Sequence, residues 1–121
     1  MNTANSGIES LISEVQAFCE ARDWDQFHNI KDLAIGVVTE GAELLELFRF
    51  QSPEECEALL LEPAKRQALE DEMADVLFFL LRIAGRYHID LPSALRAKIK
   101  KNAAKYPVEK ARGSNRKYDE F

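Results

Sequence analysis

Apolar residues recur every three or four positions along almost the whole chain, and this spacing constrains the fold more than any other feature. Glycine and proline are scarce, with 5 and 4 occurrences in 121 residues. No segment shows the alternation of apolar and polar residues that is typical of a half-buried strand. The first stretch illustrates the pattern with Ile8, Leu11, Ile12, Val15, Phe18 and Cys19. The sequence therefore predicts an all-α protein.

Capping residues and prolines divide this pattern into four long helices and one short helix. Ser6 and Glu9 have the spacing of a capping box, and Asn29 is a suitable N-cap for the next helix. Ser52 is followed by a proline at the first helical position. We expect helices over about 6–22, 29–50, 52–61, 64–86 and 92–105. Short connections between long amphipathic helices predict an antiparallel four-helix bundle with an additional short helix.

The length of the chain suits a single domain. We expect a helical domain over residues 1–107. After Pro107 the sequence becomes polar and basic, so 108–121 is expected to be a tail or flap. A chain this short buries its apolar surface incompletely, and its helices have wide apolar faces. We therefore expect a homodimer or a dimer of dimers.

The composition excludes several classes of protein. A net charge of −5 argues against a partner that is a nucleic acid polymer. We find no leader sequence and no stretch near the ~20 apolar residues that span a membrane, so we expect a cytoplasmic protein. Cys19 and Cys56 lie in separate helical segments without a C-x-x-C pattern, and we expect two reduced thiols.

Two pairs of acids stand at the edges of the apolar faces of two predicted helices. Glu40 and Glu43 are one turn apart on one helix, and Glu72 and Asp75 are one turn apart on another. The two pairs share the frame acid-x-Ala-acid-apolar-Leu, in which x is Gly41 in the first copy. One such pair is usually part of a solvated face. Two matched pairs beside the core can instead converge when the helices pack antiparallel.

Convergence of four carboxylates is costly without a cation. Two like charges 4 Å apart repel by about 4 kcal/mol at an effective dielectric constant near 20. Oxygen ligands select hard ions, so magnesium is expected, with manganese as the alternative. A di-iron bundle would need a histidine three residues after a glutamate, and neither His28 nor His88 has that spacing. The acids therefore favour a phosphoryl-transfer centre.

Further motifs accompany the acids. They are Arg22-Asp23-Trp24-Asp25-Gln26-Phe27-His28, Glu40-Gly-Ala-Glu43-Leu-Leu-Glu-Leu-Phe48, Glu72-Met-Ala-Asp75-Val-Leu, Asp90-Leu91-Pro92, Lys98, Asn102, Lys105-Tyr106-Pro107 and Arg116-Lys117-Tyr118. With these motifs the chain resembles, over nearly its whole length, the MazG-like all-α nucleoside-triphosphate pyrophosphohydrolases, and most closely their dCTP pyrophosphatase branch. The chain departs from the wider pattern at Thr39, where a glutamate is frequent, and from the branch at Phe50, where tryptophan is frequent.

The resemblance implies an activity and roles for individual residues. The activity is magnesium-dependent hydrolysis of a dCTP-like nucleoside triphosphate to the monophosphate and pyrophosphate. Glu40, Glu43, Glu72 and Asp75 would be the metal-binding and catalytic residues. Substrate-binding residues would be Trp24, His28, Phe50, Phe79, Lys98, Asn102, Lys105 and Tyr106.

Less specific interpretations of these residues stay open. The lysines also suit a solvated basic face, Phe79 also suits the core, and His28 also suits a bond to a loop carbonyl. Arg82 and Arg86 lie close to the acid stripe of their helix and also suit ion pairs with its carboxylates. A dUTPase-like enzyme of the same fold is the nearest alternative function. A non-catalytic acidic helical interaction module is the alternative from another class.

Overall fold

The computed structural model describes residues 7–120, and within this range all regular structure is helical. The α-helices are α1 Ile8–Ala21, α2 Ile30–Glu46, α3 Pro53–Leu59, α4 Pro63–Arg86, α5 Leu91–Lys105 and α6 Val108–Ala111. Two short 3-10 helices are η2 Asp25–Phe27 and η3 Tyr118–Glu120. The predicted all-α class, with four long helices and a short one between the second and third, is confirmed.

Local hydrogen bonds explain where several helices begin. The Asn29 side chain accepts a bond of 2.9 Å from the backbone N–H of Asp32 and so caps α2. Ser52 and Glu55 form a reciprocal capping box at α3, as predicted. Asp90 accepts a bond from the backbone N–H of Ser93 and caps α5. These side chains satisfy N–H groups that have no partner inside the helix.

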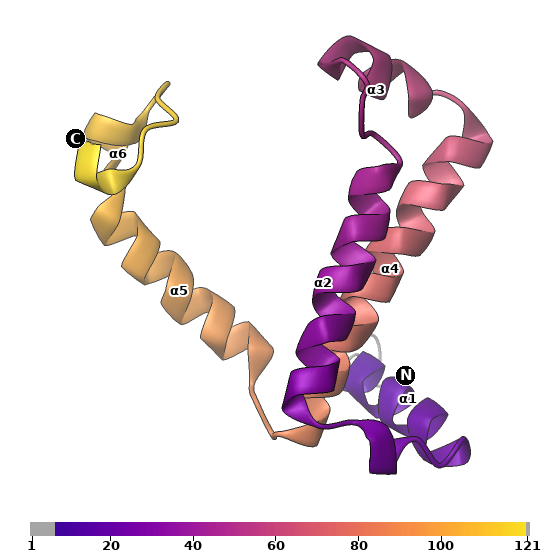
Figure 1. The fold of residues 1–121 in the computed structure, drawn as a ribbon. Helices are drawn as coiled ribbons and strands as arrows, with labels where there is room; N and C mark the ends of the chain where they lie inside the picture. The colour runs from indigo at the N-terminus through magenta and orange to yellow at the C-terminus, as the bar shows by residue number, and fades with distance from the viewer. Residues whose placement is uncertain (1–6, 121) are drawn as a thin grey trace. The chain divides into compact units, whose positions relative to one another are not determined.

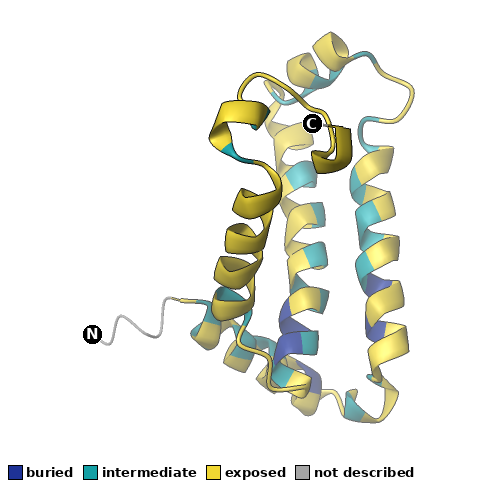
Figure 2. Cartoon of the chain, turned by 90° about the vertical axis from the view of Figure 1, so that its left-hand side faces the viewer, coloured by how far each residue is buried: buried dark blue, intermediate teal, exposed yellow. Residues whose placement is uncertain are grey.

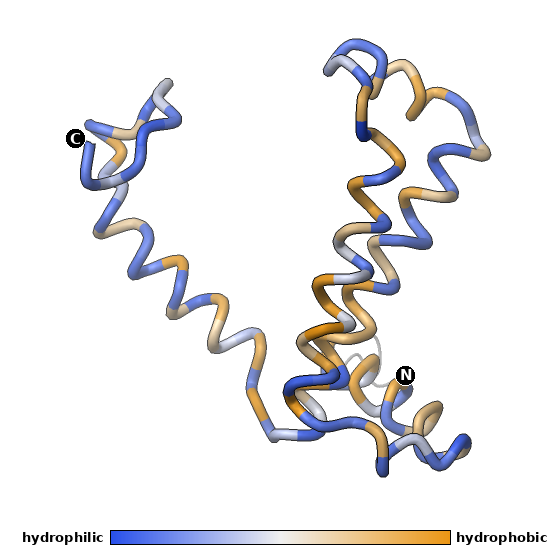
Figure 3. Tube along the Cα trace, in the orientation of Figure 1, coloured by the Kyte–Doolittle hydropathy of each residue, from blue (hydrophilic) through white to orange (hydrophobic). Residues whose placement is uncertain are grey.

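The described residues form two compact units, and the boundary along the chain lies between His88 and Ile89. In the first unit α2 and α4 run antiparallel, and α1 packs against α4 (Figure 1). The buried residues of α2 lie in its first half, and those of α4 lie near its end (Figure 2). Hydrophobic positions gather where α1, α2 and α4 approach one another (Figure 3). The buried apolar side chains are Cys19, Leu33, Leu81 and Ala84.

The second unit contains α5, α6 and η3. The Tyr118 ring packs edge-to-face on Tyr106, with 6.1 Å between ring centroids. The ammonium group of Lys105 lies 4.7 Å from the centre of the Tyr118 ring. Part of the predicted polar tail therefore folds against the end of α5. The predicted domain boundary after residue 107 stays a prediction.

Three features differ from the expected helices. The N-cap of α1 is Gly7, whereas the predicted cap Ser6 lies outside the described residues. α2 ends at Glu46, earlier than the expected end near Phe50, because the chain forms a turn before Ser52. Phe50 lies in this turn and has a positive φ of 69°. The predicted loop before α2 contains η2.

Within residues 7–120, no helix combines the length and apolar character that crossing a bilayer requires.

Candidate metal centre

Three carboxylates from two helices come together beside the contact between α2 and α4. One oxygen from each of Glu40, Glu43 and Glu72 lies within 4.8 Å of the others. Glu40 and Glu43 lie one turn apart on α2, whereas Glu72 comes from α4. Glu40 and Glu72 are half-buried, and Glu43 is exposed. Helix packing thus gathers three of the four acids that the sequence singles out.

Two oxygens of this cluster are buried and have no hydrogen-bond partner among the described residues. They are Oε2 of Glu40 and Oε2 of Glu72. A hydrogen bond with the Glu43 side chain raises the pKa of Glu40, and burial and nearby carboxylates raise it further. Burial raises the pKa of Glu72 most, followed by the charge of Glu43. Because a desolvated carboxylate needs a proton or a cation, the cluster is unfavourable by itself in the ionised state.

The donor set of the cluster fits a hard divalent cation. All the converging groups are carboxylate oxygens, which magnesium and manganese prefer over softer metals. A cation beside Glu40 and Glu72 would give both buried oxygens a partner. Asp75 is exposed and is not among the three carboxylates that lie within 4.8 Å of one another. Its charge nevertheless raises the pKa of Glu40 and of Glu72, and its place as a fourth ligand stays a prediction.

A contact between Gly36 and Phe79 sets the spacing of α2 and α4 next to the acids. Gly36 is buried one turn before Glu40, and Phe79 lies one turn after Asp75. A Cβ atom on Gly36 would come within 2.4 Å of the Phe79 ring, well inside van der Waals contact. Glycine is therefore required for this close approach. Phe79 lies in the helix interface, and its role toward a substrate stays a prediction.

The predicted aromatic substrate residues of the first unit lie in different surroundings. Trp24 packs edge-to-face on His28, with 6.1 Å between ring centroids, and on Phe18, with 5.6 Å. Trp24 is 37% exposed and His28 is half-buried, so both rings are accessible. Phe50 is 91% exposed, and the guanidinium of Arg49 lies 4.6 Å from the centre of its ring. Trp24 and His28 therefore form one local surface, and Phe50 stands outside it.

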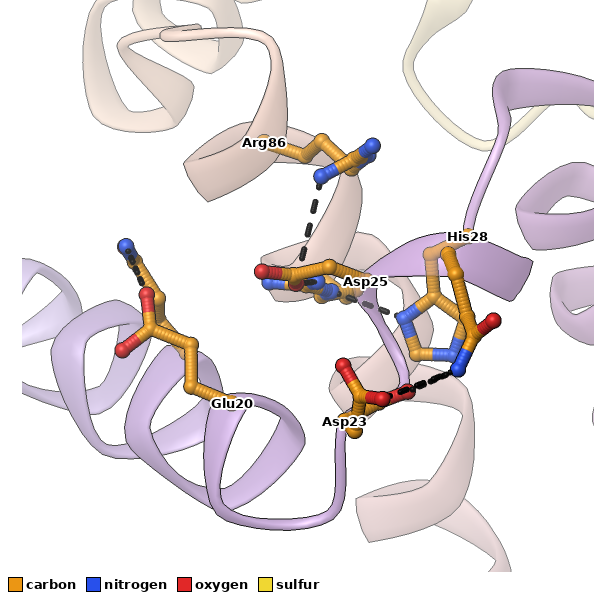
Figure 4. Close-up of polar contacts among 8 residues, drawn as sticks. Glu20, Asp23, Asp25, His28 and Arg86 are labelled. Atoms are coloured by element: carbon orange, nitrogen blue, oxygen red, sulfur yellow. Dashed lines mark hydrogen bonds and ion pairs between the residues drawn. The ribbon is translucent and has the colours of Figure 1, made fainter.

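Arg82 is a charged side chain that is almost completely buried, with 3% exposure. It forms an ion pair with Asp25 in η2, and its Nε–H donates to Nδ1 of His28 at 2.9 Å. Arg86, one turn later, approaches the same Asp25 carboxylate to 3.9 Å (Figure 4). The interpretation that Arg82 and Arg86 pair with carboxylates of their own helix is wrong, because both pair with Asp25. The segment that includes η2 folds against α4 and supplies nearer acceptors.

The remaining predicted substrate residues belong to the second unit. Lys98 and Asn102 lie on α5, Lys105 ends this helix, and Tyr106 is its C-cap. The backbone N–H of Tyr106 donates to the carbonyl of Asn102 at 2.8 Å. The interaction of these four residues with a nucleotide stays a prediction.

Sequence reasoning did not pair Asp25 with Arg82. They are 57 residues apart, and no spacing rule relates them. The one signal was the position of Arg82 inside a run of apolar residues on α4. A charge in such a run needs a buried partner, but the sequence does not say which residue supplies it.

The chain is similar to known proteins over most of its length. The MazG-like family profile matches residues 35–121. dCTP pyrophosphatase 1 from Rattus norvegicus is 42% identical over 104 residues, which cover 86% of this chain and 61% of the relative. The Homo sapiens protein of the same name is 41% identical over 104 residues, with the same coverage. The chain thus spans less than two thirds of the length of these relatives.

A solved structure of another protein has a fold similar to that of this chain. The crystal structure of a pyrophosphatase from Archaeoglobus fulgidus matches with a TM-score of 0.77 and 35% sequence identity. The match covers 83% of this chain and 92% of that protein. The family match includes α2 from Ile35 onward and all of α4, the two helices that carry the acids. The resemblance noted from the sequence is confirmed: the chain belongs to the MazG-like family.

Proposed function

We propose that this protein is a magnesium-dependent pyrophosphohydrolase that converts a deoxynucleoside triphosphate, with dCTP among the best substrates, to the monophosphate and pyrophosphate. One observation carries the proposal. Three carboxylates from α2 and α4 converge with two buried, unpartnered oxygens in a chain of the MazG-like family. The named relatives, which are dCTP pyrophosphatases, support the choice of substrate.

Glu40, Glu43 and Glu72 would hold the ion, with Asp75 as the fourth carboxylate. A bound magnesium ion supplies charge neutralisation for a triphosphate and orients water for attack. The carboxylates contribute the fixed ligand geometry, and Glu40 or Glu43 is the candidate base for the attacking water.

The motifs of the chain support our choice of the bond that breaks. Attack at the γ-phosphorus commonly uses a Gly-rich phosphate loop with a lysine, and the sequence has no G-x-x-x-x-G-K-[ST] motif. Acids with a divalent ion suit attack at the α-phosphorus, with pyrophosphate as the leaving group. Lys98, Asn102, Lys105 and Tyr106 are the proposed contacts to the phosphates and sugar. Trp24, His28, Phe50 and Phe79 are the proposed base and sugar contacts.

We further propose that the enzyme assembles as a dimer or a dimer of dimers and acts in the cytoplasm. Large apolar side chains of α2 and α4 are exposed in the single chain, including Val38 at 71% and Met73 at 55%. An apolar groove of about 390 Å³ is lined by Leu44, Met73, Ala74, Val76, Leu77 and Leu80. Exposed apolar surface of this extent is typical of interfaces. A monomeric mass by light scattering at micromolar concentration would contradict the assembly.

Phosphorus NMR of the reaction tests the proposed function. The protein is incubated with dCTP and magnesium, and the primary products are identified by their resonances. We expect the monophosphate and pyrophosphate. Orthophosphate as the primary product would contradict the assigned reaction. A panel that adds dUTP and the other nucleotides tests the base, and no turnover of any nucleotide would favour the non-catalytic module.

A further inference from the structure

The hydrogen bond between Arg82 and His28 determines the tautomer of the imidazole. Arginine carries only donors, and Nε of Arg82 lies 2.9 Å from Nδ1 of His28. Nδ1 must therefore offer its lone pair. The ring is neutral, and its proton is on Nε2. Burial and then the charge of Arg82 lower the pKa of His28, in agreement with a neutral ring.

Arg82 also holds the segment that contains His28 in place. A buried guanidinium is unfavourable unless its charge is paired. Asp25 supplies the charge, and His28, three residues later, accepts the second bond. The planar guanidinium can reach both acceptors at once, which the single ammonium group of a lysine does less well. Arg82 therefore ties the chain from Trp24 to His28 to α4.

This contact lies on the same face of α4 as Asp75, the predicted fourth acid. Arg82 follows Asp75 by seven residues, which is two turns and about 10 Å along the helix. Edge-to-face ring contacts also continue from Trp24 through Phe18, Phe78 and Phe79, and Phe79 lies in the interface beside the acids. A nucleotide with its phosphates at the acids can extend its base along this face.

We propose that Arg82 is a positioning residue of the nucleotide site, which holds His28 as an Nε2–H donor to an uncharged acceptor on the base. The inference rests on the proposed function, because it takes a nucleoside triphosphate as the ligand. No group among the described residues accepts a hydrogen bond from Nε2. A neutral donor suits a base carbonyl or ring nitrogen better than a phosphate. Trp24 beside it offers stacking that any base can use, so the directed donor supplies discrimination.

Nitrogen NMR of the histidine side chains tests the tautomer directly in the full chain. The chain has two histidines, so the resonances absent from His28→Phe identify His28. We expect the Nε2–H tautomer of a neutral ring at pH 7 in the wild type. A proton on Nδ1, or a charged ring, would overturn the proposal. This measurement needs no substitution of Arg82, so it decides even where an Arg82 variant fails to fold.

Binding of a nucleotide tests the function of the tautomer. The probe is α,β-methylene-dCTP with magnesium, and the signal is the fluorescence of Trp24, the single tryptophan of the chain. We expect Arg82→Lys and His28→Phe each to weaken binding about fivefold to tenfold, the value of one hydrogen bond. The double variant should lose no more than either single variant, because both remove the same contact. Arg86→Met, which removes the longer contact to Asp25, is the matched control and should bind like the wild type.

Measurement of turnover distinguishes a failure of this inference from a failure of the proposed function. In Arg82→Lys we expect the KM for dCTP to rise by the same factor as the dissociation constant, with kcat within about twofold of the wild type. Pyrophosphate release with an unchanged KM in Arg82→Lys would overturn the inference and leave the proposed function intact. Analogue binding that depends on Arg82 and His28, without turnover, would support the inference and contradict the hydrolase. A wild type that binds no nucleotide would overturn both.

Discussion

Two polar clusters lie about three turns apart along α4, counted from Glu72 to Arg82, and they differ in how their charges are balanced. In the arginine cluster, buried Arg82 is paired with Asp25 and bonded to His28. In the acid cluster, like charges converge, and buried oxygens of Glu40 and Glu72 have no partner. The first cluster is balanced by residues of the chain. The second needs a proton or a cation from outside.

The two clusters illustrate two different roles of buried charge. A buried ion that is fully paired holds one segment against another, as Arg82 holds η2 against α4. A buried acceptor without a partner requires a separate explanation, since native proteins satisfy most such groups. For the acid cluster we propose that a divalent cation is that explanation. On this proposal, one cluster serves positioning and the other serves chemistry.

The largest expected effect is the loss of turnover when a ligand of the acid cluster is removed. Glu43→Gln should lower kcat/KM more than about a hundredfold, because even loss of an outer contact to a metal ligand costs 10–100-fold. Asp75→Asn should act in the same direction. Glu46→Gln is the control, since Glu46 is exposed and pairs with Arg49. A pyrophosphate-release assay measures all three, and near-wild-type turnover in Glu43→Gln and Asp75→Asn would remove the acid cluster from the chemistry.

Binding of magnesium at the acid cluster should strongly stabilise the folded protein. At a concentration about a hundred times the dissociation constant, the ion should raise the melting temperature of the wild type by about 10 °C. Glu72→Gln should melt higher than the wild type without metal, because one repelling charge is gone, and should gain less from magnesium. Arg86→Met, near the arginine cluster, should keep the full magnesium shift. Equal magnesium shifts in the wild type and Glu72→Gln would contradict the account.

An added methyl group at Gly36 should disturb the packing of α2 against α4, whereas one at Gly41 should not. Gly36→Ala should destabilise the fold by about 1–3 kcal/mol, because its Cβ would overlap the Phe79 ring. Gly41→Ala is the matched control on the same helix, with no atom within 4 Å of the added Cβ. It should stabilise by about 0.5–1 kcal/mol, the helix preference of alanine. Urea unfolding measures both, and equal effects would show that the Gly36 contact is relaxed in solution.

The smallest expected effect is a pH dependence of the metal-free protein. The folded state raises the pKa of Glu40 and Glu72 above the usual 4.5, so it binds protons more tightly than the unfolded state. Stability from this source is present below about pH 4.5 and is lost as the pH rises through the folded pKa values. The advantage of Glu72→Gln over the wild type should therefore grow from pH 4.5 to pH 7. Thermal melts in a chelator measure it, and a constant difference would argue against the raised pKa.

Much of the fold could be predicted because its signals are local. Asn29 and the Ser52 capping box mark helix starts within four residues, and the structure confirms both. The end of α2 was placed too late, since Phe50 has a residue type that suits a helix but a positive φ that does not. The 3-10 helix η2 was missed because three residues show no periodicity.

In the candidate site, too, the local relations could be predicted from the sequence and the long-range contacts could not. Glu40 and Glu43 share a helix, and the period of 3.6 residues predicts their common face. Convergence with Glu72 followed from antiparallel packing of two amphipathic helices. The bond from Arg82 to His28 spans 54 positions in the sequence and depends on how η2 folds against α4. No local pattern carries that information.

The most direct test of the contrast between the clusters is a crystal structure with manganese. Anomalous scattering at the manganese edge reports where the ion binds without reference to activity. We predict a peak among the carboxylates of Glu40, Glu43 and Glu72, and none beside Arg82. The absence of a peak at the acids under millimolar manganese at neutral pH would contradict the central claim.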